Sequence, residues 1–203
     1  MIEIQNIYLK SSGKDILHDI TISFMRNKLT LINGHNGAGK TSLIKIVANI
    51  IAPTSGIVEF KNKSDIVKTS FSFQEPKFLV RSVEDNLLHT LYCYNKYFSN
   101  DYKCLIKNSL DQFNLLSIIN SPAHQLSAGE KKVLSYIRST IVNPTILFLD
   151  EPLAYLDDSY VDILLSHIKN LSQKTKVIMV NHSNTFIDDY ATDIITLNRG
   201  RLI

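Results

Sequence analysis

Eight consecutive residues, 34–41, combine glycines with a lysine and a threonine in the pattern G-x-x-x-x-G-K-[ST]. They are Gly34, His35, Asn36, Gly37, Ala38, Gly39, Lys40 and Thr41, and Ser42 follows them. Glycines allow backbone N–H groups to point inward around an anion, and the positive end of a following helix strengthens the attraction. Lys40 would reach the β- and γ-phosphates of a nucleotide, and the Thr41 hydroxyl would ligate Mg²⁺. A glycine-rich turn that binds nothing is the alternative, but the complete match favours a phosphate-binding loop.

Two adjacent acids, Asp150 and Glu151, follow the apolar residues 146–149. Such a run is typical of a buried parallel strand, and open α/β sheets bind ligands at the carboxyl ends of their strands. At that edge Asp150 would hold Mg²⁺, directly or from the second shell, and Glu151 would polarise the water that attacks the γ-phosphate. The alternative is a solvated Asp-Glu-Pro turn that caps the next helix, and the phosphate loop makes it the weaker interpretation.

Residues 126–130, Leu-Ser-Ala-Gly-Glu, stand directly before a predicted helix over 131–142. Ser127 at the N-cap and Gly129 near it would expose backbone N–H groups to an anion. A serine N-cap with an acid three residues later is also an ordinary capping box. The position of the segment shortly before Asp150 favours the anion-binding interpretation.

Alternating and continuous apolar patterns predict the elements that position these residues. The expected strands are residues 2–9, 20–33 with an apolar end over 29–32, 57–60 and 68–73, with turn signals at 11–14 and 26–28. Helical spacing over 39–51, directly after the glycines, ends before Pro53. We therefore expect an N-terminal antiparallel β layer that passes into a β/α arrangement.

From about residue 82 to residue 142 the pattern is mainly helical, with a break at 120–122. Residues 145–149 and 176–180 are continuous apolar runs, as in parallel strands that are buried on both faces. Helical spacing over 157–171 between these runs predicts a right-handed strand-helix-strand unit. A helical insert is thus expected between two parts that are rich in strands.

Composition excludes several classes of protein. The 203 residues are 44% hydrophobic and 20% charged, which predicts one globular domain and not a disordered chain. Twenty-two basic and 19 acidic residues leave a net charge of +3, too small to argue for a nucleic-acid partner. Two cysteines without a C-x-x-C pair favour a reducing, cytosolic compartment. We expect neither a signal peptide nor a spanning segment, because no sufficiently long apolar stretch is present.

Taken in order, these motifs resemble those of the ATP-binding cassette (ABC) ATPases over essentially the whole chain. The phosphate loop resembles Walker A, Gln74 resembles the Q-loop glutamine, and residues 126–130 resemble the LSGGQ signature. Asp150 and Glu151 resemble Walker B with its catalytic glutamate. Leu156-Asp157 resembles the D-loop, and His182 resembles the switch histidine. The resemblance implies an α/β fold with a P-loop NTPase (RecA-like) core of ABC ATPase type, an N-terminal antiparallel β subdomain and an inserted helical subdomain. It implies one domain over residues 1–203, with the insert at about 78–142.

The same resemblance implies ATP and Mg²⁺ as cofactors and a homodimer that sandwiches ATP. Walker A of one subunit would then face the signature, with Ser127 and Gly129, of the other. Gln74 would bridge Mg²⁺ and the attacking water, and His182 would sense the γ-phosphate. The alternatives are a surface glutamine and an incidental polar residue after a strand. The expected metal-binding residues are Thr41, Gln74 and Asp150, and the expected catalytic residues are Glu151, His182 and Gln74.

Two segments depart from the family pattern. The signature has Ala128 and Glu130 where LSGGQ has Gly and Gln, so a neutral edge becomes acidic. The aromatic platform for adenine normally follows the first strand, but residues 10–13 read Lys-Ser-Ser-Gly, with Tyr8 and His18 as the nearest rings. Signature binding is expected to be retuned, and the preference for ATP over other nucleotides stays open.

A transport role would require separate integral membrane permease subunits, on whose cytoplasmic side at the inner membrane this chain would be peripheral. We expect the apolar-rich residues 75–80 to form part of the groove for a membrane subunit, with simple core packing as the alternative. The compact length and the LSAG-type signature are similar to those of the ATP-binding subunits of the haem exporter in cytochrome c biogenesis. Another ABC exporter or importer and a low-turnover regulatory subunit are the alternatives; soluble ABC proteins of translation or DNA repair usually need two cassettes.

Overall fold

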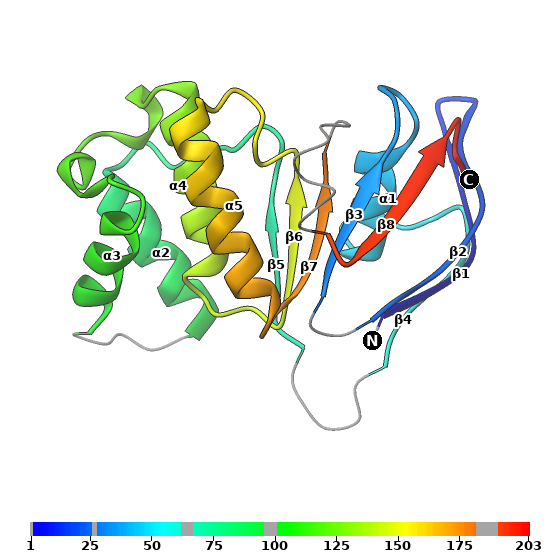
Figure 1. The fold of residues 1–203 in the computed structure, drawn as a ribbon, viewed down its shortest axis with the longest axis horizontal. Helices are drawn as coiled ribbons and strands as arrows, with labels where there is room; N and C mark the ends of the chain where they lie inside the picture. Colours follow the sequence, from blue (N-terminus) through cyan, green and yellow to red (C-terminus); the bar gives the residue numbers. More distant parts are fainter. Residues whose placement is uncertain (1, 26–27, 62–66, 96–100, 182–190) are drawn as a thin grey trace.

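A computed structural model describes residues 2–25, 28–61, 67–95, 101–181 and 191–203 (Figure 1). The strands are β1 (Ile2–Ser11), β2 (Lys14–Phe24), β3 (Leu29–Asn33), β4 (Ser55–Phe60), β5 (Thr69–Ser72), β6 (Ile146–Asp150), β7 (Lys176–Val180), β8 (Asp193–Asn198) and β9 (Arg201–Leu202). The helices are α1 (Lys40–Val47), α2 (Val83–Asn95), α3 (Tyr102–Asp111), α4 (Ala128–Thr140) and α5 (Asp158–Ser172), with short 3₁₀ turns η1 (Leu116–Ile118) and η2 (Ala123–Gln125).

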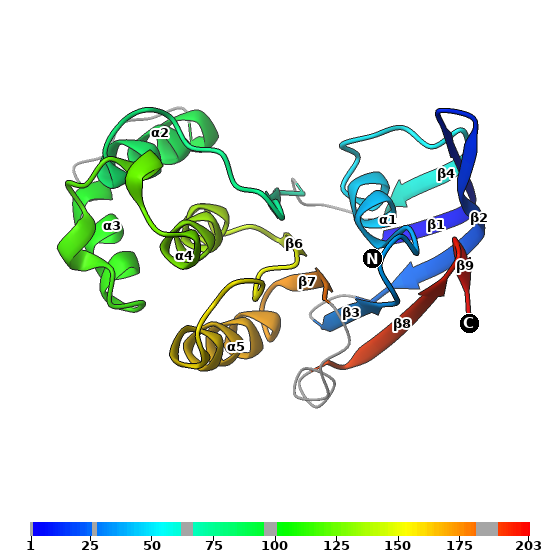
Figure 2. The same cartoon turned by 90° about the horizontal axis from the view of Figure 1, so that it is seen from above.

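The strands form two sheets. One is antiparallel, in the order β2-β1-β4, and the other has six strands in the order β5-β6-β7-β3-β8-β9. In the larger sheet β5, β6, β7, β3 and β8 are parallel, and β9 pairs antiparallel with β8. Figure 2 shows α1 between the two sheets, whereas α2–α5 lie on the other side of the larger sheet. The expected antiparallel layer and α/β core are confirmed.

Alternation along the central strands divides the core into two layers. Along β6, Leu147 and Leu149 pack with the helices α2–α5, whereas Ile146 and Phe148 pack with α1 and the antiparallel sheet. Every residue of β6 and of β7 is buried, and the two strands pair in parallel. Because both faces of the sheet are covered, these strands carry the continuous apolar runs that the sequence analysis used to predict them.

The first hairpin begins earlier than its pattern predicts. Strand β2 starts at Lys14, not at residue 20, because the turn is closed by only two residues, Ser12 and Gly13. Both have positive φ, 49° and 77°, which is the type I′ geometry that fits the twist of two antiparallel strands. The turn itself lies where the sequence predicts it.

One expected helical boundary is wrong, and one expected break is wider than predicted. Helix α1 ends at Val47, not at residue 51, because Asn49 adopts a left-handed φ of 58° and the Ile50 N–H bonds back to the Lys45 carbonyl. The stretch from about residue 82 to residue 142 is mainly helical, as predicted, but its break is wider than residues 120–122. Helix α3 ends at Asp111, Asn114 is left-handed at φ 57°, and residues 112–127 contain only η1 and η2.

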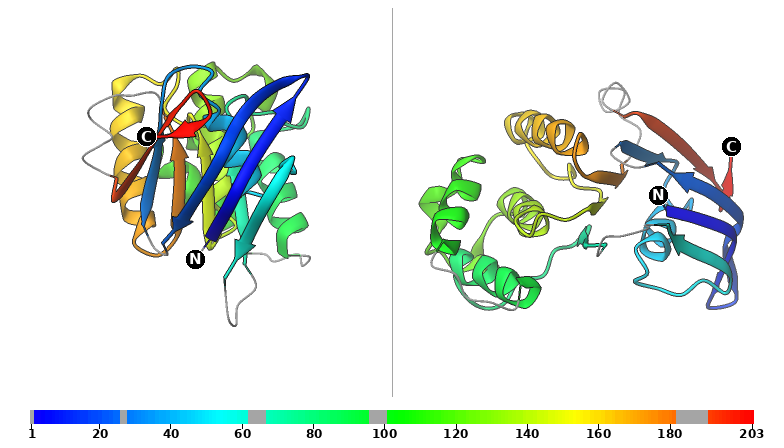
Figure 3. Two further views of the ribbon diagram at one scale, coloured as in Figure 1. Left: turned by 90° about the vertical axis from the view of Figure 1, so that its right-hand side faces the viewer. Right: turned by 90° about the horizontal axis from the view of Figure 1, so that it is seen from below.

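The parallel strands bring their carboxyl ends to one edge of the larger sheet. Ile32 of β3 pairs with Val180 of β7, and Asp150 at the end of β6 pairs with the same Val180. The phosphate loop after β3 and the acids that end β6 therefore lie at the same edge, on either side of β7 (Figure 3). Among the described residues, no helix combines the length and apolar character that crossing a membrane requires.

Candidate functional site

The phosphate loop needs glycine at two positions where neighbouring backbone is close. Gly34 has φ 148°, and a Cβ there would lie 2.3 Å from the carbonyl oxygen of Leu197. Gly39, the N-cap of α1, has φ 99°, and its Cβ would lie 2.8 Å from the Leu17 side chain. Strands β8 and β2 thus press against the two ends of the loop, so that only glycine fits.

The last hairpin, formed by β8 and β9, also holds the loop by hydrogen bonds. His35 Nε2 lies 3.0 Å from Asn198 Oδ1, and the Gly200 N–H donates to the Ala38 carbonyl at 3.0 Å. Gly200 in turn accepts a hydrogen bond from the His18 N–H at 2.8 Å. The contributions of Asn198 and Gly200 were missed from the sequence, because no local pattern indicates which residues return to a loop made so much earlier in the chain.

Lys40 lies inside the loop. Its ammonium donates to the carbonyl oxygens of Gly34 at 2.7 Å and of His35 at 3.0 Å. Burial lowers the pKa of Lys40, and the carboxylates of Glu151 and Asp150 oppose that change. Lys40 is therefore a cation that two loop carbonyls hold and that interacts with two carboxylates.

Thr41 and Asp150 join the loop to the end of β6. Thr41 Oγ1 donates to Asp150 Oδ1 at 3.0 Å. Asp150 is only 1% exposed, and burial raises the pKa of its carboxyl, which the hydrogen bond from Thr41 opposes. Within the described part of the chain, Asp150 Oδ2 is buried and accepts no hydrogen bond. A hydroxyl beside a carboxylate with a spare buried oxygen fits Mg²⁺, a hard cation that prefers oxygen ligands.

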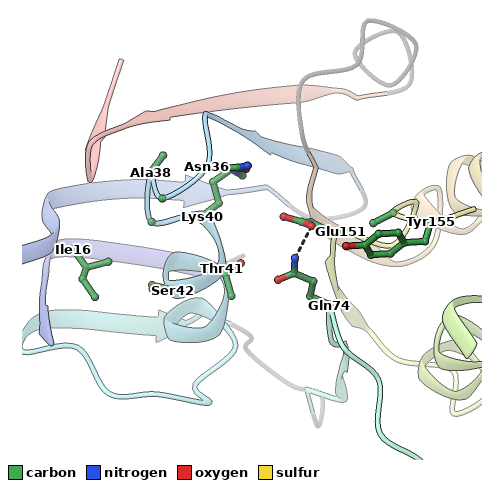
Figure 4. A pocket seen from close by; sticks show the side chains of 12 residues that line it. Ile16, Asn36, Ala38, Lys40, Thr41, Ser42, Gln74, Glu151 and Tyr155 are labelled. Carbon is green, nitrogen blue, oxygen red and sulfur yellow. Dashed lines mark hydrogen bonds between the residues drawn. The ribbon is translucent and has the colours of Figure 1, made fainter. Parts of the chain in front are cut away.

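Glu151 and Gln74 meet across the same edge. Gln74 Nε2 donates to Glu151 Oε2 at 2.7 Å, as the dashed line in Figure 4 shows. Glu151 has φ 50°, an uncommon conformation for a non-glycine residue, and its N–H donates to the Val180 carbonyl at 3.0 Å. The turn after β6 therefore directs the glutamate side chain toward the residue after β5 and not along the strand.

A cavity of about 660 Å³ lies over these residues (Figure 4). Its lining comprises Ile16, residues 36–42 of the loop and α1, Gln74, Glu151, Ala154 and Tyr155. Ile16 is among the lining residues, whereas Tyr8 and His18 are not. Tyr155, which the sequence analysis did not single out, is 81% exposed and left-handed at φ 67°.

The signature residues lie apart from this cavity. Ser127 caps α4 in a capping box, in which its Oγ accepts from the Glu130 N–H at 3.2 Å and donates to Glu130 Oε2 at 2.7 Å. Ser127 and Gly129 are not among the residues that line the cavity. A single chain therefore brings the phosphate loop, Gln74 and the two acids together, but not the signature. His182 lies outside the described residues.

A model of the family described as ABC transporter matches residues 17–154, more than half of the chain. The chain belongs to this family. The matched ABC transporter segment runs from β2 to the turn after β6, and so contains the loop, Gln74, the signature and both acids. Membership in the ABC transporter family implies nucleotide binding and ATP hydrolysis.

Similar proteins agree with this membership. The probable iron export ATP-binding protein FetA of Escherichia coli K12 is 31% identical, over 97% of this chain and 91% of its own. The tungstate uptake system ATP-binding protein TupC of Peptoclostridium acidaminophilum is 28% identical, over 99% and 96%. A dimeric ATP-binding cassette solved in a post-hydrolysis state with ADP and Pi has a TM-score of 0.89 at 21% identity, over 100% and 96%. The predicted ABC ATPase fold is thus confirmed.

Proposed function

We propose that this chain is the ATP-binding and ATP-hydrolysing subunit of an ABC transporter complex and that it energises separate membrane subunits. The observation that carries this proposal is a pair of side-chain hydrogen bonds at one edge of the larger sheet, from Thr41 to Asp150 and from Gln74 to Glu151. Glycine-loop, carboxylate and amide groups converge there on a cavity of about 660 Å³. Relatives named as ATP-binding proteins of uptake and export systems support the same role.

The phosphate loop would bind the triphosphate of ATP. Its backbone N–H groups and the N-terminus of α1 would face the phosphates, and Lys40 would reach the β- and γ-phosphates. Thr41, Asp150 and Gln74 would hold Mg²⁺, which would supply neutralisation of the phosphate charge when bound. Ser42, which lines the cavity, completes the loop side of the site.

Glu151 is the proposed general base. It would accept a proton from the water that attacks the γ-phosphate, while the Gln74 amide, 2.7 Å from the carboxylate, orients both groups. His182 is retained as the proposed γ-phosphate sensor on the motif order alone. The domain boundaries, 1–203 with an insert at about 78–142, stay predictions as well.

A second copy of the chain would complete the site. Ser127 and Gly129 lie at the N-terminus of α4 but do not line the cavity of their own chain. In a homodimer, the N-terminus of α4 in one subunit would cover the γ-phosphate held by the other. Glu130 already accepts the Ser127 hydroxyl, so this half of the site presents a carboxylate close to the triphosphate.

ATP turnover by the purified chain tests the catalytic role. Glu151→Gln should lower kcat by about 10²–10⁴-fold, the usual contribution of a general base, while ATP binding is retained. Glu59→Gln removes the same charge from an exposed position of β4 and should leave turnover unchanged. Undiminished turnover in Glu151→Gln would exclude this glutamate as the base and favour a different or regulatory role.

Docking to a membrane subunit would use residues 75–80. Phe78 packs under the Arg138 guanidinium, whose carbon lies 4.6 Å from the ring centroid, and Arg138 donates to the Lys77 carbonyl at 2.7 Å. Leu79 is exposed and Val80 is 81% exposed. Val80→Asp should therefore prevent assembly without disturbing the core, and intact assembly in a pull-down would contradict the docking role.

Haem export in cytochrome c biogenesis is the proposed transport role, at the cytoplasmic face of the inner membrane. Its support is the LSAG-type signature over residues 126–129. The relatives named above belong to tungstate uptake and iron export, so another ABC importer or exporter is the second candidate. The membrane proteins that co-purify in mild detergent decide between them, since haem-handling partners support the first and a nutrient permease supports the second.

A further inference from the structure

Lys132 is a buried lysine on the signature helix that no motif assigned. It lies on α4 and is only 4% exposed. Its ammonium donates to two backbone carbonyls, those of Gln74 and of Glu151, the second at 3.0 Å. These are the two residues whose side chains bond to each other at 2.7 Å. One lysine therefore closes a ring of hydrogen bonds through the proposed hydrolytic pair.

Both acceptors lie where the regular sheet ends. Gln74 follows β5, which ends at Ser72, and Glu151 follows β6, which ends at Asp150. Beyond these ends, hydrogen bonds between neighbouring strands no longer fix the backbone. Glu151 also has a left-handed φ of 50°, which costs about 1–3 kcal/mol for a non-glycine residue. Such a conformation persists only where its surroundings hold it, and the bond from Lys132 to the Glu151 carbonyl is one such restraint.

The charge of Lys132 argues against a packing role alone. Its ammonium is buried, and the carboxylates of Glu151, Asp150 and Glu75 are the acidic groups that interact with it. An ammonium in this environment is costly, and an apolar side chain of similar length would pack without that cost. What an apolar side chain cannot supply is two N–H donors directed at two separate turns.

We propose that Lys132 is a positioning residue for ATP hydrolysis, which fixes Gln74 and Glu151 relative to each other from the signature helix. This inference rests on the proposed function, because it assumes that Glu151 is the base. The Lys132 ammonium donates to the backbone carbonyls of Gln74 and Glu151 and not to their side chains, so it acts through the backbone of the two turns. Its loss should therefore affect the chemical step more than nucleotide binding.

The test compares kcat, KM for ATP and equilibrium ATP binding in purified variants. Lys132→Met should lower kcat by about 10- to 100-fold, because small misplacements of reacting groups cost about that much, with KM within about threefold of the parent. Lys132→Arg keeps a cation with several N–H donors and should recover most of the lost kcat. Lys107→Met, which removes an exposed lysine from α3, is the matched control and should leave both constants unchanged.

The outcomes separate this inference from the proposed function. Turnover is divided by the fraction of chains that bind ATP, so a folding defect in Lys132→Met does not imitate a catalytic one. An unchanged kcat in Lys132→Met, a loss confined to KM, or a failure of Lys132→Arg to recover activity would each overturn the positioning role while Glu151→Gln still abolished turnover. Turnover that does not depend on Glu151 would overturn the proposed function, and this inference with it.

Discussion

Lys176, in the central strand β7, makes the stability of this chain depend on pH. The side chain is 4% exposed, its ammonium donates to Thr30 Oγ1 at 2.6 Å and lies 5.9 Å from the centroid of the Phe24 ring. Burial lowers the pKa of Lys176 from 10.5 to about 8, against the attraction of Asp193 and together with the repulsion of Lys28. Burial in the folded core therefore favours the neutral amine of Lys176 over the charged ammonium.

The sign and size of the effect follow from these two pKa values. Below about pH 8 the lysine is protonated in both states, and the whole cost of burying the charge is present. As pH rises through that value the folded chain releases the proton while the unfolded chain keeps it, so the free energy of unfolding rises. A tenfold change in proton affinity corresponds to about 1.4 kcal/mol, so the free energy of unfolding rises by at most about 3 kcal/mol over the whole titration. About 1 kcal/mol of that rise takes place between about pH 7 and pH 9.

Urea unfolding at the two pH values measures this dependence. The double variant Lys176→Met with Thr30→Val replaces both members of the buried pair by apolar groups, so that no hydroxyl is left unpartnered. At pH 7 the double variant should be the more stable chain, and its advantage over the parent should shrink by about 1 kcal/mol at pH 9. Lys174→Met removes an exposed lysine two residues away and should follow the parent at both values.

Equal changes in the free energy of unfolding of the parent and of the double variant between pH 7 and pH 9 would refute this reasoning. They would mean that Lys176 titrates at its ordinary value, and that the strand tolerates the charge without cost. A larger advantage of the double variant at pH 9 would reverse the sign and exclude burial as the dominant cause.

Three further changes test the site and its support. Gly34→Ala places a Cβ 2.3 Å from the Leu197 carbonyl oxygen, so ATP affinity measured by titration calorimetry should fall by at least about tenfold; a normal affinity would show that the loop accommodates the methyl group. Tyr136→Phe removes the hydroxyl that lies 2.8 Å from His167 Nδ1 and should lower the urea-derived free energy of unfolding by about 1–2 kcal/mol, whereas an unchanged value would mean that this contact contributes nothing net. Asp150→Asn removes one charge beside a spare buried oxygen and should raise the Mg²⁺ concentration for half-maximal turnover by at least about tenfold, and a shift of less than twofold would argue against a metal role.

Features that depend on local chemistry could be predicted from the sequence. The phosphate loop is such a feature, since glycines, a lysine and a threonine at fixed spacing encode both its shape and its charge. The doubly buried strands β6 and β7 are another, because their apolar runs have no other stable place than the middle of a covered sheet. Asp157 likewise marks the start of α5, where its side chain accepts from the Tyr160 N–H at 3.0 Å.

What could not be predicted depends on residues far apart in the chain or on single backbone angles. Asn49 stops α1 by a left-handed φ that many asparagines do not adopt, and nothing near it in sequence requires one. The restraint on Glu151 comes from Lys132, and that pairing exists only after α4 packs beside β5 and β6. Motif order predicts which residues form the site, but the contacts between those residues belong to the tertiary structure.

The clamp of the last hairpin on the phosphate loop has a consequence for synthesis. Residues 34–41 are synthesised well before Asn198 and Gly200, which contact them in the folded chain. A nascent chain therefore carries the complete nucleotide motif well before the residues that hold its loop have been made. A chain shortened before Asn198 should therefore keep every motif that surrounds the cavity but lack the residues that hold the phosphate loop.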